Sequence, residues 1–322
     1  MKRVQLYLIV VIAICAAAIV HFTDIASEHN VKTDAGRQGI PSVPAASVTP
    51  ASKGTAPPRI KHIRQRPDAS LSVSRQVSSV SPPMASTLPA VAPLRAFKEP
   101  VTGIEFIPVP GGCFQMGDSN GDSDEKPVHQ VCLDDFYIGR YEITQGQWLQ
   151  IIGSRPSFFS SCGDDCPVEN VNWNDSQEFI RKLNDASGRP YRMLTEAEWE
   201  YACRSGGKME RFCGSDDVGA VAWYDRNSGS KPHPAGVKQA NGLGANDMSG
   251  NVCEWVNDWF HKEYYGSSPS RNPEGPASGS RRVIRGGSWY NNSINVRGTI
   301  RASDDPDHRS INLGFRIALS SR

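Results

Sequence analysis

Residues 233–259 read HPAGVKQANGLGANDMSGNVCEWVNDW, and residues 283–289 read VIRGGSW. Glycine and asparagine recur every few residues in both stretches, and aromatic residues are interspersed without the period of a long helix. The same character extends from residue 103 to the C-terminus. We therefore expect an α+β domain that is rich in loops and low in regular secondary structure.

Short strands and helices are expected around these two stretches. Apolar segments bounded by turn residues predict the strands, at residues 105–108, 114–116, 282–285 and 314–318. Helical periodicity predicts a helix over residues 144–152 and a second over 174–184, which Asn174 is placed to cap. Thr195 with Glu198 three residues later has the spacing of a capping box and opens a third, shorter helix.

The N-terminal 23 residues have the pattern of a membrane-targeting segment. Lys2 and Arg3 precede an apolar run over residues 6–20. The run continues past the small residues at 16–18, which favours an uncleaved signal-anchor, a transmembrane helix, over a cleaved signal peptide. The basic pair predicts a cytoplasmic N-terminus, so we expect the chain to be anchored in the inner membrane with its C-terminal domain on the periplasmic or extracytoplasmic side.

Residues 24–100 are rich in proline, serine and alanine and almost free of aromatic residues. Such a composition buries too little apolar surface to offset its ordering entropy, so we expect a disordered linker before a folded domain at 101–322. A basic cluster at residues 59–66, RIKHIRQR, lies within the linker. The net charge of +1 gives no indication of a nucleic-acid partner.

Eight cysteines are present, and Cys15 lies in the N-terminal apolar run. In an oxidising compartment the other seven predict disulfides with one thiol left over. Proximity in sequence suggests three pairs, and a zinc site built from the two short-spaced pairs is the competing interpretation. Cys253 is the remaining thiol and is expected to be a buried apolar residue. The suggested pairs are Cys113 with Cys132, Cys162 with Cys166, and Cys203 with Cys213.

Seven sequence strings stand in a fixed order along the chain. They are GGCFQMGD from Gly111, PVHQVCLDDFYIGRYEITQGQW from Pro127, CPVENVNWNDSQEF from Cys166, YRMLTEAEWEYACRSG from Tyr191, the 233–259 stretch, VIRGGSW from Val283 and NLGFRIA from Asn312. Over residues 103–322 the chain resembles the formylglycine-generating enzyme, or sulfatase-modifying factor, family. The resemblance implies that family's fold, which is distantly similar to C-type lectins.

The resemblance also implies one calcium site, in the segment DMSGNVCEW. The matching positions are Asp247, Gly250, Val252 and Glu254. Two carboxylates and two backbone carbonyls are hard oxygen ligands of the kind that Ca²⁺ accepts. The alternative is that Asp247 and Glu254 hydrogen-bond to loop amides.

The family's catalytic chemistry is not expected in this chain. The resemblance implies two copper-binding cysteines shortly after the Gly-Gly-Ser motif, and direct counting puts Asn291 and Val296 at these positions. Neither side chain can replace a thiolate for Cu(I). The histidines of the domain form no pair suited to non-haem iron, so neither copper nor iron is expected as a cofactor.

A polar and aromatic binding cleft is expected in place of the cysteine pair. Amides, guanidinium groups and aromatic rings suit a peptide, protein or glycan partner. Two alternatives remain open: the arginines make internal ion pairs, or the domain is an oxidoreductase or tailoring enzyme that works without the cysteine pair. The candidate residues of this cleft are Ser288, Trp289, Tyr290, Asn291, Asn292, Arg297, Arg301, Arg316 and Asp258.

Overall fold

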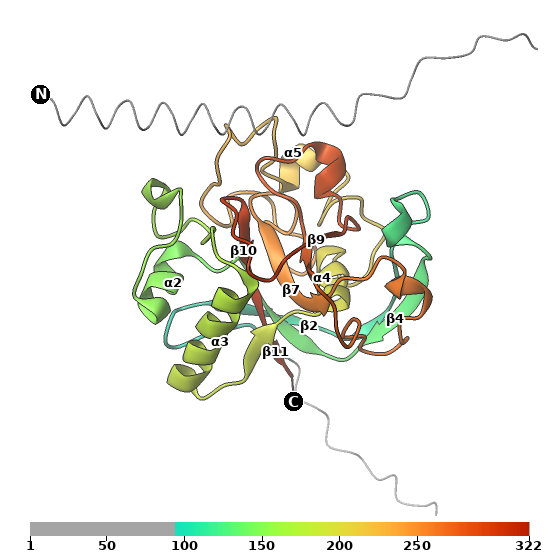
Figure 1. The fold of residues 1–322 in the computed structure, drawn as a ribbon, viewed down its shortest axis with the longest axis horizontal. Helices are drawn as coiled ribbons and strands as arrows, with labels where there is room; N and C mark the ends of the chain where they lie inside the picture. The colour runs from blue at the N-terminus through green and yellow to red at the C-terminus, as the bar shows by residue number, and fades with distance from the viewer. Residues whose placement is uncertain (1–93, 322) are drawn as a thin grey trace, which may run out of the picture. The chain divides into compact units, whose positions relative to one another are not determined.

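The computed structural model describes residues 94–321, which are drawn in colour in Figure 1. A five-stranded antiparallel sheet of this part has the order β1-β2-β5-β11-β6. Its strands are Phe97–Lys98 (β1), Glu105–Val109 (β2), Phe136–Gly139 (β5), Ile317–Ser320 (β11) and Tyr191–Met193 (β6). The predicted targeting segment at 1–23 and nearly all of the predicted linker lie outside the described residues.

A second sheet of the described part has four strands in the order β10-β7-β8-β9, and β10 runs parallel to β7. These strands are Leu313–Phe315 (β10), Cys253–Trp259 (β7), Arg282–Arg285 (β8) and Ala302–Asp304 (β9). A separate antiparallel hairpin joins Gly112–Met116 (β3) to His129–Leu133 (β4).

The helices are short and lie between the strands in the chain. The α-helices are Gln145–Ile152 (α2), Trp173–Ser187 (α3), Glu196–Cys203 (α4) and Val218–Val221 (α5). The 3₁₀ helices are Ser123–Glu125 (η1), Ser160–Cys162 (η2), Tyr264–Gly266 (η3) and Ser293–Val296 (η4).

Helices α2 and α3 lie side by side at one edge of the domain (Figure 1), where they enclose an aromatic core. The indole of Trp148 stacks on Phe179 at a centroid distance of 5.6 Å, and Phe179 meets Phe315 of β10 edge to face at 5.5 Å. A second buried cluster packs α4 against the strands through Trp199, Val256 and their neighbours. These two clusters hold the short elements together, because elements of this length are not stable by themselves.

Of the two helix caps predicted from the sequence, Thr195 is confirmed and Asn174 is wrong, while Thr144, the expected first residue of its helix, is itself a cap. Thr144 caps α2 and Thr195 caps α4, each paired with the side chain three residues later. Asn172, not Asn174, caps α3, because its side chain and that of Asp175 bond reciprocally to each other's backbone N–H groups. The amide of Asn174 instead donates to the carboxylate of Asp307.

The predicted strand at 314–318 was wrong, since this segment contributes to two strands in different sheets. Arg316 lies between β10 and β11, and its side chain turns into the interior. The folded domain also begins a few residues before the expected boundary at 101. Strand β1 pairs with β2, and the ring of Phe97 stacks on Phe106 at 5.0 Å, which anchors this strand to the domain.

All three suggested disulfides are present: Cys113–Cys132, Cys162–Cys166 and Cys203–Cys213. Cys113 and Cys132 are directly opposite each other in the β3–β4 hairpin. The zinc alternative was therefore wrong for these cysteines. Between residues 94 and 321 the structure contains no helix long and apolar enough to cross a bilayer.

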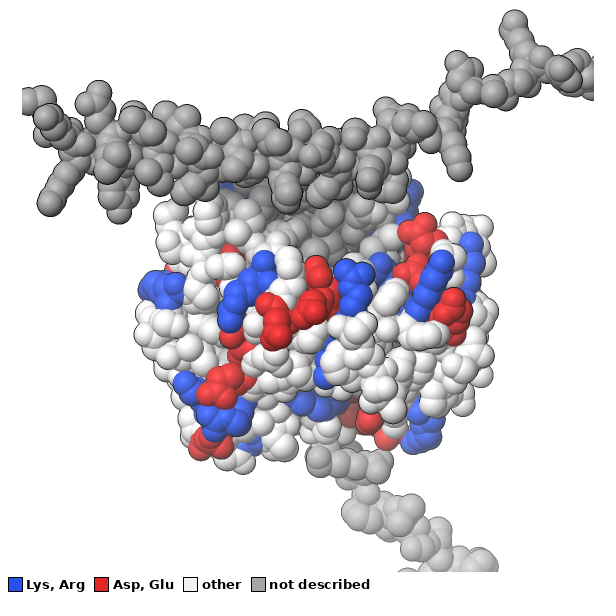
Figure 2. Space-filling view, in the orientation of Figure 1, with Lys and Arg blue, Asp and Glu red and all other residues white. Residues whose placement is uncertain are grey.

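On the face shown in Figure 2, acidic and basic side chains are interspersed instead of being separated into large patches of one sign. Nucleic-acid binding depends on an extended basic surface. The distribution of charge on this face is therefore that of an ordinary solvated protein surface.

Candidate functional site

Ser288 is positioned by the tight turn that follows strand β8. Gly286 and Gly287 have φ angles of +89° and +66°, which favour glycine. A Cβ atom on Gly287 would come within 2.3 Å of the backbone oxygen of Asn295, so a larger residue does not fit there. The backbone angles of both residues and the lack of space at Gly287 therefore account for the two glycines of the Gly-Gly-Ser motif.

Ser288, Asn291 and Asn312 form a connected polar group at this turn. The Ser288 hydroxyl donates to Asn291 Oδ1 at 2.8 Å, and the backbone N–H of Ser288 donates to the same oxygen at 2.9 Å. Asn312 Nδ2 donates to Ser288 Oγ at 3.0 Å. The amide of Asn291 thus fixes the turn through its oxygen.

Cys253 reaches this polar group from strand β7. Its Sγ lies 3.9 Å from Asn291 Oδ1, and its backbone N–H donates to the oxygen of Asn312 at 2.8 Å. The residue is half-buried, and desolvation raises the pKa of its thiol to about 12. The thiol is therefore protonated at neutral pH, which suits neither a nucleophile nor a ligand for a soft metal.

Four aromatic side chains, Phe158, Phe159, Trp289 and Tyr290, form what we call the aromatic row. Successive rings meet edge to face at centroid distances of 5.0, 5.4 and 5.7 Å. The inner ring of Trp289 is buried, whereas Phe158 is 67% exposed and Tyr290 is 61% exposed. Rigid rings that remain in contact with water at both ends of a packed row are typical of a binding surface.

A buried carboxyl group holds the loop that carries Phe158 and Phe159. Glu169 Oε1 accepts the backbone N–H of Phe159 at 2.8 Å, while its Oε2 is buried with no partner among the described residues. Burial raises the pKa of Glu169 to about 7. The Cys162–Cys166 disulfide closes the far end of the same loop.

Sequence reasoning missed Phe158, Phe159 and Glu169 as parts of the site. Two adjacent phenylalanines in a polar loop were the one available signal, since nothing local buries them. The contact of Phe159 with Trp289 joins segments that are far apart in the chain, so no local pattern could place them together.

Val296 does not face this polar group. Its side chain is fully buried against Phe212, Val221 and Ala222. Asn292 caps η4 by accepting the backbone N–H groups of residues 294 and 295. Of the two positions matched to the family's cysteines, one is therefore in the polar group and the other is in the core.

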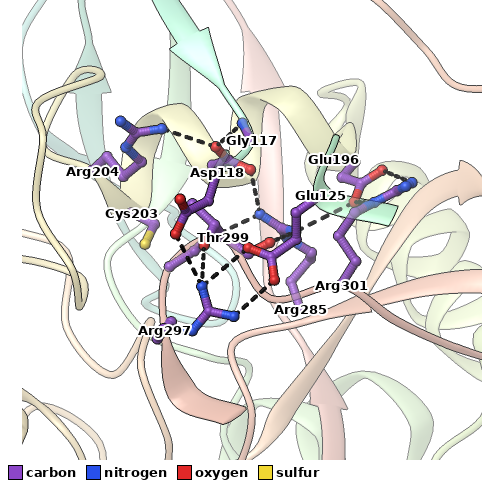
Figure 3. A network of polar contacts seen from close by, with 12 residues as sticks. Gly117, Asp118, Glu125, Glu196, Cys203, Arg204, Arg285, Arg297, Thr299 and Arg301 are labelled. Carbon is purple, nitrogen blue, oxygen red and sulfur yellow. Dashed lines mark hydrogen bonds and ion pairs between the residues drawn. The ribbon is translucent and has the colours of Figure 1, made fainter. Parts of the chain in front are cut away.

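The three candidate arginines make internal ion pairs, which was the alternative left open by the sequence. Arg297 bonds to Glu125 and Asp118, and Arg301 is bidentate to Glu196, as Figure 3 shows. Arg316 is fully buried and holds Glu254. The structure therefore does not bring their guanidinium groups to the surface beside Ser288.

Asp258 is also an interior residue. One of its carboxylate oxygens accepts the backbone N–H of Glu196 at 2.8 Å, at the first turn of α4. Burial, followed by the charge of nearby Glu196, raises the pKa of Asp258 well above its usual range. Its position supports a role in holding α4 and not in contacting a partner.

The segment matched to the family's calcium site is buried and carries excess carboxylates. Asp247, at a φ angle of +58°, accepts the N–H of Gly236 through Oδ2, and its Oδ1 is buried without a partner in the described part of the chain. Burial raises the pKa of Asp247 to about 6. Burial, followed by the charge of Asp247, raises the pKa of Glu142 well above its usual range. The positively charged guanidinium of Arg316 interacts electrostatically with all three nearby carboxyl groups, those of Glu142, Asp247 and Glu254.

This donor set fits a hard cation in part. The Asp247 oxygen that lacks a partner here and the surplus negative charge suit calcium. Glu254, in contrast, accepts two bonds from Arg316 and one from the indole of Trp199. No cluster of three or more His, Cys, Asp or Glu side chains suited to a metal occurs within residues 94–321, so backbone carbonyls would have to complete the ligand set.

Comparison with known proteins gives consistent matches for this domain. Residues 94–321 match the family described as "Sulfatase-modifying factor enzyme 1-like domain". The chain is similar to the chaperone protein LppX of Paenibacillus barcinonensis, with 33% identity over 244 residues that cover 60% of this chain and 80% of the relative. It is also similar to the formylglycine-generating enzyme of Streptomyces coelicolor, with 30% identity over 284 residues that cover 66% of this chain and 88% of the relative.

A solved structure supports the same fold. Variable protein 1 of Treponema denticola aligns with a TM-score of 0.65 and 29% sequence identity, over 70% of this chain and 98% of that one. The match spans nearly the whole of that protein. It confirms the expected loop-rich α+β fold class.

Proposed function

The chain belongs to the sulfatase-modifying factor enzyme 1-like family, and from this premise we propose that it is a binding protein without the family's oxidase chemistry. The protein binds a peptide, protein or glycan partner, and it acts as an accessory or regulator of another system. The contact surface consists of the aromatic row with Asn291 and Asn312, which the buried hydroxyl of Ser288 holds in place.

The position of Asn291 is the observation that carries this proposal. A carboxamide at the site matched to a copper-binding cysteine accepts two bonds from Ser288, and the nearby thiol of Cys253 is protonated at neutral pH. Val296, at the second matched position, is in the core. Oxygen activation on Cu(I) needs thiolates that these residues do not supply.

The exposed ends of the aromatic row support a function in binding a partner, in place of oxygen activation on copper. Phe158 and Tyr290 offer rigid apolar area, since their rings are already held by Phe159 and Trp289. A binding site that is ordered before its partner arrives loses less conformational entropy on association. Asn291 supplies an amide group beside the rings for orienting contacts.

The alternative function is an oxidoreductase or tailoring enzyme acting on a peptide or small molecule. The observation that favours it is the position of Cys253 on strand β7, which brings a thiol within 3.9 Å of Asn291 in the loop after β8. A partner or substrate that lowered the pKa of this thiol would restore a nucleophile at this position.

Metal analysis and oxygen uptake separate the two functions. The full-length chain is purified, its copper, iron and calcium contents are measured, and oxygen uptake is followed with a Cys-x-Pro-x-Arg peptide. The binding function predicts no stoichiometric copper or iron and no aldehyde formation. Stoichiometric copper or iron together with oxygen uptake would establish the enzyme alternative.

Peptide and glycan arrays then test the surface directly. Ligands retained by the wild-type chain should be lost by Phe158→Ala and Tyr290→Ala. They should be kept by Val237→Ser, which changes an exposed apolar side chain outside the aromatic row. Equal retention by all four proteins would overturn the assignment of this surface.

We propose further that residues 1–23 anchor the chain in the inner membrane and that the domain works in the exported compartment. The three disulfides support an oxidising location. Protease treatment of intact spheroplasts tests this proposal. External protease should degrade the domain, and a domain that stays protected until the cells are lysed contradicts it.

Calcium at Asp247 is a separate proposal. The residues that would hold it are Asp247 and the carbonyls of Gly250 and Val252, with Glu254 beside them. Bound calcium would neutralise the surplus carboxylate charge and tie the loop together. It has no part in a chemical step.

A further inference from the structure

A groove of about 870 Å³ is lined by none of the residues of the aromatic row and plays no part in the function proposed above. It is formed by the loop after β3, by the loop that the Cys203–Cys213 disulfide closes, and by η4 with the segment after it. Three apolar side chains on its walls are in contact with water: Met209 at 87% exposure, Ile294 at 58% and Val128 at 37%.

The floor of the groove is a completed ion-pair network, which Figure 3 shows. Arg204 donates to the carboxylate of Glu200, to two backbone oxygens and toward the sulfur of Met209. Arg297 donates to the carboxylates of Glu125 and Asp118 and to a neighbouring hydroxyl. Because these guanidinium groups already have their acceptors, the floor is not a site for an anionic ligand.

The rim of the groove carries an excess of negative charge. Three lining carboxylates make no ion pair with any residue between 94 and 321: those of Asp122, Glu210 and Asp216. Among the basic residues that line the groove, Arg211 alone makes no ion pair within the same range. Asp122 lies in the loop after β3, Glu210 and Asp216 lie between α4 and α5, and the three do not form a metal-binding cluster within that range. The unneutralised charge therefore favours a cationic ligand spread along the rim.

The residue composition of the walls further limits which class of ligand the groove can bind. The residues lining the groove include no aromatic ring, which a sugar would need for stacking. Met209 supplies a flexible thioether that adapts to apolar side chains of different shape. The loop beneath it is held by the disulfide and by Arg204, so this wall is in place before a ligand arrives.

We propose that this groove binds an extended basic and apolar peptide segment of a partner protein, whose apolar side chain contacts Met209 and Ile294 while flanking Lys or Arg residues meet the acidic rim. The volume is within the range of ligand sites in proteins. The apolar walls supply affinity, and the carboxylates fix orientation and reject acidic segments.

The experiment uses the full-length chain with ¹³C-methyl methionine and three blocked synthetic peptides, KLKLK, KSKSK and ELELE. The Met209 methyl resonance, assigned with Met209→Leu, should shift on titration with KLKLK and remain unchanged with the other two. Raised salt should weaken KLKLK binding, since the rim charges are exposed to solvent.

Two sets of variants complete the test. The first set combines Met209→Ser with Ile294→Ser, and the second combines Asp122→Asn, Glu210→Gln and Asp216→Asn. Each set should weaken KLKLK binding by about tenfold or more. Val237→Ser, at an exposed apolar residue that does not line the groove, is the control and should bind as the wild type does. Thermal midpoints within the wild-type range confirm that each variant is folded.

Three results would overturn the proposal: no Met209 shift with millimolar KLKLK, equal binding of ELELE, or unchanged affinity in both sets of groove variants. A Met209 shift with KLKLK that one folded set of variants abolishes supports it even if the other set does not fold. Loss of binding in Tyr290→Ala, with Met209 unaffected, places the peptide on the aromatic row and also rejects the groove.

Discussion

Arg316 and Glu254 form a bidentate ion pair in which both side chains are buried. Arg316 Nη2 lies 2.6 Å from Glu254 Oε1, and Arg316 Nε lies 2.7 Å from Oε2. The same guanidinium donates to the backbone oxygens of Gly139 and Asn246, so it joins both sheets to the loop before β7. This pair explains why regular strand structure is interrupted at Arg316, between β10 and β11.

Replacement of Arg316 by Met should therefore be strongly destabilising. Removal of one member of a buried pair leaves the other charge uncompensated, so we expect the free energy of unfolding to fall by about 3–5 kcal/mol. Guanidinium-induced unfolding under non-reducing conditions measures this change. Arg181→Met is the matched control, because Arg181 makes its ion pairs on the exposed face of α3. A similar midpoint for both variants would contradict the structural role of Arg316.

Calcium removal should lower the stability of the wild-type domain. If calcium binds the native state alone, a concentration 100 times its Kd adds about 2.7 kcal/mol to the free energy of unfolding. Thermal unfolding with calcium or with EGTA measures this effect. Asp247→Asn should lose the difference, and Asp225→Asn, an exposed change, should keep it. Identical wild-type midpoints under both conditions would reject the calcium proposal.

Glu169 should make stability depend on pH near neutrality. Its pKa is raised to about 7 in the folded chain by burial, above its value of 4.5 when unfolded. The native state therefore holds more protons between these values, and stability falls as the pH rises through this window. The full effect is on the order of 3 kcal/mol.

Glu169→Gln tests this dependence, since it keeps the shape and removes the ionisation. Urea unfolding at pH 5 and pH 8 should show a smaller loss of stability for the variant than for the wild type. Glu274→Gln, at an exposed position, is the control and should follow the wild type. A wild type with equal stability at both pH values would show that Glu169 is not a buried titrating group.

Cys253 should be unreactive until the domain unfolds. Desolvation raises the pKa of its thiol to about 12, so little thiolate exists at neutral pH. Labelling with N-ethylmaleimide, followed by peptide mass spectrometry, should modify Cys253 in guanidinium and leave it free under native conditions. The six disulfide cysteines should stay unlabelled in both. Rapid native labelling would instead favour the enzyme alternative.

Local features of the fold were predictable because their interactions span a few residues. Thr144 and Thr195 begin helices through contacts three residues ahead, and the three disulfides join cysteines that are near in sequence. The error at α3 had a local cause too, since Asn172 and Asn174 are both asparagines near the helix start. The reciprocal bond to Asp175 decides between them.

The candidate site was predictable in part. The turn at Ser288 and the amide of Asn291 were identified from their motif, whereas the roles of the three arginines depended on distant partners. These partners are Glu125 for Arg297, Glu196 for Arg301 and Glu254 for Arg316. An arginine looks the same in a sequence whether its partner is a buried carboxylate or a ligand, and burial and distance separate the two cases.

The sequence by itself determined the family, the loop-rich fold class and the loss of the cysteine pair after the Gly-Gly-Ser turn, and it suggested the disulfide pairs. The tertiary structure alone decided which polar residues remain available to a partner. It buries the arginines in ion pairs, places Val296 in the core, and brings Phe159 against Trp289. The physical reason is that capping and disulfide formation depend on near neighbours, while exposure depends on every segment that packs around a side chain.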